Sequence, residues 1–111
     1  QTRAFCYITD AVKGTVLAME QPNTNGQIYH IGTQDEITIG ELIHYAGELM
    51  GYKGVYENAP TYPGSVSRRC PDITKARTQL GFEPEVLWKE GLKKTIEWYN
   101  QYLGEGNKVY E

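Results

Sequence analysis

The segment TIGELIHYAGELMG, residues 38–51, carries the signals of both ends of an α-helix. Thr38 and Glu41 have the spacing of a capping box, in which the threonine hydroxyl accepts a free backbone N–H of the first turn. Gly51 stands where a helix commonly ends in a left-handed residue. Apolar residues recur between these signals every three or four positions, at Ile39, Leu42, Ile43, Ala46, Leu49 and Met50. The segment therefore predicts an amphipathic helix.

Strand-like runs alternate with helical segments along the chain. AFCYIT, QIYHIG and GVYENAP, at residues 4–9, 27–32 and 54–60, are rich in the aromatic and branched residues typical of strands. Each run is followed by a segment with helical periodicity. This alternation predicts an α/β fold with a short, mostly parallel sheet and about four helices.

The other predicted helices follow acidic residues or turn signals. Asp10 is predicted to be the N-cap of a helix that places Val12, Val16 and Met19 on one face. Asp72 is predicted to cap a short helix that ends at Gly81. The last helix is predicted over residues 88–103, where apolar side chains again recur at helical spacing. We predict one domain over residues 1–103, followed by a polar tail over residues 104–111.

Charge and composition exclude several classes of protein. The net charge of −3 argues against a nucleic-acid or anionic-membrane binder, since such proteins normally carry a basic excess. No apolar run approaches the roughly 20 residues that span a bilayer. With no signal pattern at its start either, the sequence predicts a cytoplasmic protein. Cys6 and Cys70 have neither zinc-type nor CxxC spacing, so in that compartment they are predicted to be two reduced, packed thiols.

No complete catalytic, metal or cofactor motif is present in the sequence. It contains no GxGxxG, no GxxxxGK[ST] and no tyrosine with a lysine four residues later. His30 and His44 lack the spacing of metal ligands, so we predict no metal site. Asp35 and Glu36 precede a helix and are predicted to be solvated charges.

The loop sequence SVSRRCPD raises the question of an anion. Arg68 and Arg69 follow Pro63 and Gly64, which let a loop approach a ligand closely, and a guanidinium fork fits phosphate oxygens in bidentate geometry. The alternative is a pair of surface charges, solvated or in salt bridges with nearby acids. Arg3, just before the first strand-like run, is a third candidate.

Three stretches in register resemble one known family. TRAFCYITDAVKGTVLAME, QIYHIGTQDEITIGELI and SRRCPDITKARTQLGFEPEVLWKEGLKKTIEWY resemble the carboxyl-terminal part of NAD-dependent sugar-nucleotide epimerases and dehydratases, the extended short-chain dehydrogenase/reductase family. The likeness covers nearly all of the chain and is greatest to the branch of UDP-sugar epimerases and UDP-glucuronate decarboxylases.

The resemblance implies a role for each candidate in the loop. In the family, the arginine that matches Arg3 contacts the substrate diphosphate, and a second phosphate-binding arginine matches Arg69 or, as the second choice, Arg68. Tyr62 and Ser67 are then expected to line the same loop, with Tyr62 either stacking on the ligand or packing in the protein. The expected ligand is a nucleotide-sugar such as a UDP-sugar.

The resemblance also implies what lies outside this chain. The glycine-rich NAD loop and the YxxxK acid/base pair belong to an amino-terminal Rossmann half, so the chain alone is expected to be an inactive fragment of a homodimeric enzyme. The absence of an initiator Met before Gln1 agrees with this expectation. An isolated copy is expected to expose an apolar patch and to self-associate. A stand-alone nucleotide-sugar-binding module and a structural or interaction domain without catalysis are the alternatives.

Overall fold

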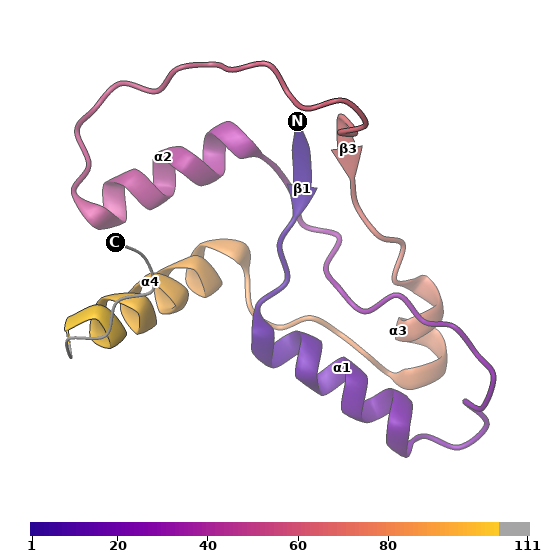
Figure 1. Ribbon diagram of the computed structural model, residues 1–111. Helices are drawn as coiled ribbons and strands as arrows, with labels where there is room; N and C mark the ends of the chain where they lie inside the picture. Colours follow the sequence, from indigo (N-terminus) through magenta and orange to yellow (C-terminus); the bar gives the residue numbers. More distant parts are fainter. Residues whose placement is uncertain (105–111) are drawn as a thin grey trace.

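A computed structural model describes residues 1–104 of the chain. The elements follow one another as β1 (Thr2–Ala4), α1 (Ile8–Glu20), β2 (Glu36–Thr38), α2 (Ile39–Met50), β3 (Arg68–Arg69), α3 (Thr74–Leu80) and α4 (Trp88–Gly104) (Figure 1). The predicted α/β class is confirmed, and residues 1–104 contain the four predicted helices. Of the predicted polar tail, Gly104 is the last residue of α4, and residues 105–111 lie outside the described residues.

The sheet is short, as predicted, and mixed rather than mostly parallel. Its strand order is β2-β1-β3. The central strand β1 runs antiparallel to β2 and parallel to β3. Three segments that are distant in the sequence therefore meet at the amino terminus of the chain.

The predicted strand positions were largely wrong. The first run overlaps β1 only at Ala4, because α1 already begins at Ile8. Residues 27–32 alternate as a strand would, with Tyr29 and Ile31 packed on the core and Ile28 77% exposed. They pair with no strand within residues 1–104, so they do not form the predicted strand there. Residues 54–60 belong instead to the exposed segment that arches from α2 to β3 (Figure 1).

Asp10 does not cap α1, contrary to the prediction. It lies in the first turn of the helix and is only 2% exposed. Its carboxylate accepts hydrogen bonds from the backbone N–H groups of Glu85, at 3.1 Å, and Val86, at 2.9 Å. The residue at the N-cap position, Tyr7, makes no side-chain capping bond. Asp10 thus ties the segment before α4 to the start of α1.

The predicted ends of α2 are confirmed. The Thr38 hydroxyl accepts a hydrogen bond from the Glu41 backbone N–H at 3.0 Å, and Gly51 has the left-handed φ of 71°. The N-cap of α3 is Ile73, one residue after the predicted Asp72, although Asp72 accepts hydrogen bonds from the backbone N–H and the hydroxyl of Thr74 at 2.9 and 2.6 Å. These bonds are local, which is why the sequence predicts them well.

The main apolar core lies between α1 and α3. Its fully buried members are Ile73, Ala76, Leu80 and Phe82, against which Leu17, Ala18, Tyr29 and Ile31 pack. Helices α2 and α4 pack against each other separately, with an edge-to-face contact of Tyr45 and Trp88 at 5.4 Å. The radius of gyration is 17.0 Å, against about 13 Å for a compact domain of this length. The chain is therefore less compact than a typical domain of its length.

Helix α1 exposes most of one apolar side. Val12, Val16 and Met19 share a face, as predicted, and together with Ile8 they form the apolar face of α1, with exposed fractions between 40% and 79%. This face is the exposed apolar patch that the sequence predicts for an isolated copy. No helix among the described residues is both long and apolar enough to cross a membrane. Cys6 and Cys70 are free, as predicted.

Candidate anion-binding site

The register of the sheet separates the two adjacent arginines. In the parallel pairing of β1 with β3, Thr2 lies beside Arg68 and Arg3 lies beside Arg69. Paired residues project from the same face of a sheet, and successive residues of a strand project from opposite faces. Arg3 and Arg69 therefore share one face, and Arg68 shares the other with Thr2.

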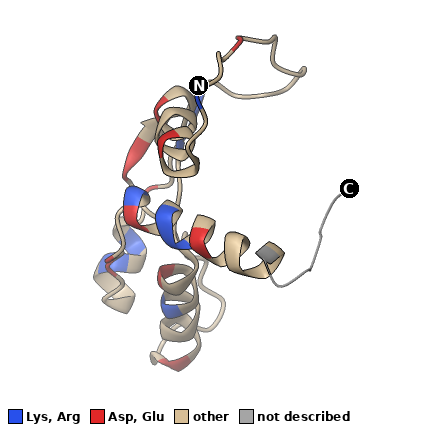
Figure 2. Ribbon diagram, turned by 90° about the vertical axis from the view of Figure 1, so that its left-hand side faces the viewer, with Lys and Arg blue, Asp and Glu red and all other residues tan. Residues whose placement is uncertain are grey.

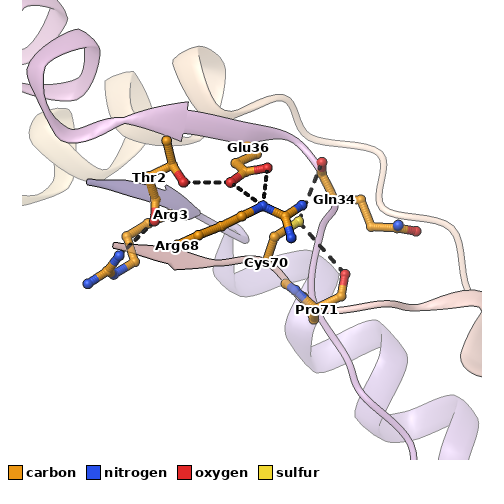
Figure 3. Close-up of polar contacts among 7 residues, drawn as sticks. All are labelled: Thr2, Arg3, Gln34, Glu36, Arg68, Cys70 and Pro71. Atoms are coloured by element: carbon orange, nitrogen blue, oxygen red, sulfur yellow. Dashed lines mark hydrogen bonds and ion pairs between the residues drawn. The ribbon is translucent and has the colours of Figure 1, made fainter. Parts of the chain in front are cut away.

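Arg68 is bound to a carboxylate on its face of the sheet. Its Nε donates to both carboxylate oxygens of Glu36, at 3.1 and 2.9 Å, and the Thr2 hydroxyl donates to the same carboxylate at 2.5 Å (Figure 3). The Thr2 and Arg68 hydrogen bonds lower the pKa of Glu36, and the Glu36 hydrogen bond raises the pKa of Arg68. The charge of Arg68 is thus compensated within the protein.

The other face carries two arginines without an acidic partner. Arg3 donates to the backbone carbonyls of Thr2, at 2.7 Å, and Val66, at 3.0 Å, both of which are uncharged. Within residues 1–104 the exposed Arg69 side chain makes neither a hydrogen bond nor an ion pair, and no carboxylate pairs with Arg3. Figure 3 shows the Arg3 guanidinium turned away from that of Arg68. Arg3 and Arg69, called here the arginine pair, can therefore attract an anion.

A tight turn borders the arginine pair. The Ser65 backbone N–H donates to the Tyr62 carbonyl at 3.2 Å, and Gly64 has a φ of 89°, which the third residue of a type II turn requires. The Gln1 side chain donates to the Ser65 hydroxyl at 2.7 Å. Ser67 lies against β1, where its carbonyl accepts the Thr2 N–H at 2.9 Å. Tyr62 is 73% exposed, so it is available to a ligand rather than packed in the protein.

Glu36 is the residue of this region that sequence reasoning misread. It was predicted to be a solvated charge near a helix, yet it lies in β2 and contacts side chains from β1 and β3. Its partners are 34 and 32 positions away in the sequence, so no local sequence pattern predicts these contacts. Only a correct strand register would have found them.

Two other features of residues 1–104 differ from the arginine pair. Figure 2 shows both acidic and basic residues along the helices. A hollow of about 370 Å³ lies between α2, α4 and the connection from β1 to α1. Its lining is mainly apolar, with Phe5, Tyr7, Leu42, Trp88 and Leu92 among its residues, and holds no Lys or Arg. It therefore lacks a group to neutralise a phosphate.

The family of the chain follows from its similarity to known proteins. A family model described as GDP-mannose 4,6 dehydratase matches residues 1–95, so the chain belongs to that family. The predicted membership of the extended short-chain dehydrogenase/reductase family is confirmed by this match and by the relatives below.

Two curated relatives illustrate the branch. The chain is 36% identical over 107 residues to UDP-N-acetyl-alpha-D-glucosaminuronate decarboxylase of Bacillus cytotoxicus, covering 91% of the chain and 33% of that protein. It is 39% identical over 104 residues to UDP-glucuronic acid decarboxylase 5 of Arabidopsis thaliana, covering 94% of the chain and 30% of that protein. The chain thus spans about a third of the length of these relatives.

Solved structures show the same fold. UDP-glucose 4-epimerase of Thermotoga maritima, solved with UDP-glucose, superposes with a TM-score of 0.84 at 34% identity, over 92% of this chain and 32% of that one. UDP-glucuronic acid 4-epimerase of Bacillus cereus, solved with UDP-glucuronic acid and NAD, gives 0.84 at 31% identity, over 91% and 32%. These similarities bear out the assignment to an extended Rossmann-type family.

Proposed function

We propose that this chain is the substrate-binding part of an NAD-dependent sugar-nucleotide epimerase, dehydratase or decarboxylase. The arginine pair binds the diphosphate of a nucleotide-sugar, and Tyr62 and Ser67 line the loop beside it. Arg68 is the weaker candidate, because Glu36 already holds its guanidinium. A UDP-sugar is the ligand that fits the relatives, whose names refer to UDP-linked sugars.

The observation that carries this proposal is the pairing of Arg3 with Arg69. Two permanently charged side chains on one face of a small sheet repel each other, and an anion between them removes that cost. A diphosphate carries about two negative charges and offers oxygens to both forks. Holding the substrate in this way contributes to catalysis by fixing the position of the sugar ring.

We propose no NAD site in this chain. The sequence contains neither a glycine-rich dinucleotide loop nor a YxxxK pair, so we assign no step of hydride transfer to it. NAD, the Rossmann half and a homodimeric assembly are proposed for the intact enzyme, and the chain alone is proposed to be inactive. A cytoplasmic location stays a prediction.

Titration with UDP tests the proposal directly. We expect UDP and UDP-glucuronic acid to shift the backbone amide NMR signals around Arg3 and Arg69, while uridine, which has no phosphate, leaves them unchanged. Arg3→Ala and Arg69→Ala should each weaken binding about tenfold or more, since each removes a charged hydrogen-bond donor. Arg77→Ala is the matched control, because Arg77 pairs with Glu83 away from the sheet.

The alternative functions give different results. A stand-alone binding module responds to UDP in the same way but is encoded without a Rossmann half. A structural or interaction domain shows no response at millimolar UDP, and Arg69→Ala then lowers the melting temperature instead. Unchanged spectra with UDP and UDP-glucuronic acid at millimolar concentration would contradict the proposed diphosphate site.

A further inference from the structure

We infer that Glu36 is a positioning residue for the arginine pair, acting through Arg68. The inference rests on the proposed diphosphate site and names a residue on the opposite face of the sheet. The Glu36 carboxylate hydrogen-bonds to Thr2 and Arg68 rather than to the arginine pair, so its role is to orient the strand that carries Arg69.

The carboxylate of Glu36 links all three strands of the sheet. Glu36 itself belongs to β2, Thr2 to the central strand β1 and Arg68 to β3. The Thr2 hydroxyl and the Arg68 Nε both donate to Glu36 Oε2, at 2.5 and 2.9 Å (Figure 3). One side chain therefore spans the full width of the sheet, from one edge strand to the other.

Such a link matters most at β3, because this strand has only two residues. The segment before it is long and exposed, and a two-residue ladder alone holds a strand weakly. Arg68 and Arg69 are adjacent, so fixing the side chain of Arg68 on one face limits the rotation of the backbone that presents Arg69 on the other. Glu36 thereby sets the spacing of Arg69 from Arg3.

The link also decides which arginine meets the ligand. Glu36 occupies the Nε side of the Arg68 fork, so this guanidinium stays on the face away from the arginine pair. Without Glu36, a third free cation lies next to the site, and simple electrostatics then favours tighter anion binding. A positioning role predicts the opposite, namely weaker anion binding when Glu36 is lost. The affinity for an anion therefore distinguishes the positioning role from a purely electrostatic effect.

The test is UDP affinity, measured by calorimetry on the chain and its variants at a temperature where circular dichroism shows each to be folded. We expect Glu36→Ala to weaken UDP binding about five- to tenfold, in line with the loss of a charge-assisted hydrogen bond. Glu36→Gln keeps an acceptor oxygen and should lose less. Arg68→Ala should weaken binding as Glu36→Ala does, and the double variant should lose no more than either single one.

Glu85→Gln supplies the matched control. It removes the same charge from a surface ion pair of the same length, between Glu85 and Lys13 of α1 at 2.9 Å, in which neither residue belongs to the sheet. Its UDP affinity should equal that of the unaltered chain. If Glu36→Gln and Glu36→Ala bind UDP as tightly as the unaltered chain or more tightly, the positioning role is overturned.

The failure of this inference differs from the failure of the proposed function. If the unaltered chain binds UDP through Arg69 and the Glu36 variants show no loss, only the role of Glu36 falls. If the unaltered chain does not bind UDP, both fall together. If Glu36→Ala does not fold, the UDP affinity of Glu36→Gln still tests the positioning role, since glutamine preserves the size and one acceptor of the side chain.

Discussion

The buried carboxylate of Asp10 accepts the backbone N–H of Val86 at 2.9 Å, across 76 positions of the chain. It also accepts the N–H of Glu85, so replacing it leaves two backbone donors without their partner. We expect Asp10→Ala to lower the free energy of unfolding by about 2–3 kcal/mol, the cost of losing buried hydrogen bonds to a charged group. Urea unfolding measures it. Asp10→Asn, which keeps one acceptor, should cost less, and an unchanged midpoint in Asp10→Ala would show that the contact contributes nothing.

Gly14 tests the close approach of α1 to the core. A Cβ added there would lie 2.5 Å from Ile31 Cγ2 and 3.1 Å from a ring carbon of Phe82. Although alanine is the better helix former by about 1 kcal/mol, overpacking costs about 1–3 kcal/mol, so Gly14→Ala should lower the melting temperature. Gly40→Ala in α2 is the matched control, because its Cβ meets nothing closer than 3.8 Å. This control should be neutral or stabilising, and equal effects in both variants would refute the packing argument.

Acid should weaken the fold partly through Glu36. The pKa of its carboxyl group is lowered in the folded chain, by the Thr2 hydroxyl first and by Arg68 next. Its contribution is therefore present above the ordinary glutamate pKa and is lost as the pH falls below about 4. Melting temperature measured between pH 7 and pH 2.5 should fall less steeply in Glu36→Gln. Asp72, whose pKa is lowered by its hydrogen bonds to Thr74, keeps some acid dependence in that variant.

Self-association should occur through the apolar face of α1. Val12 is 53% exposed and Met19 79% exposed, with no covering element in residues 1–104. Sedimentation of the chain at rising concentration should show dimers, and Val12→Lys should return it to the monomer. Leu87→Lys is the control, since Leu87 is also exposed, at 68%, but lies outside α1. A clean monomer of the unaltered chain at high concentration would contradict this expectation.

The sequence predicted the local features well. Thr38 and Gly51 at the ends of α2, and Asp72 before α3, act on backbone groups within a few positions, so their patterns can be read directly. The start of α4 at Trp88 also follows the predicted periodicity. The family resemblance, which rests on three stretches in order, was confirmed by the family model that matches residues 1–95.

The sequence failed where a residue acts over a long distance. Asp10 has the chemistry of an N-cap, and only the folded chain shows that it serves Val86 instead. Residues 27–32 have the alternation of a strand without a neighbour to pair with, while β3 is too short to carry any pattern. Arg3 and Arg69 were candidates from the loop sequence and from the family resemblance, but their common face follows from the register of β1 and β3.

The arginine pair brings together positions 3 and 69, so it exists only when the first strand has met the middle of the chain. Closing so large a loop costs chain entropy, and the hydrogen bonds of a two-residue ladder offset only a small part of that loss. A ligand that bridges the two guanidinium groups offsets part of that loss, and by mass action it favours the form in which β1 and β3 are paired. If the proposed function is correct, saturating UDP should therefore raise the melting temperature, with the bound diphosphate as a final cross-link of this sheet.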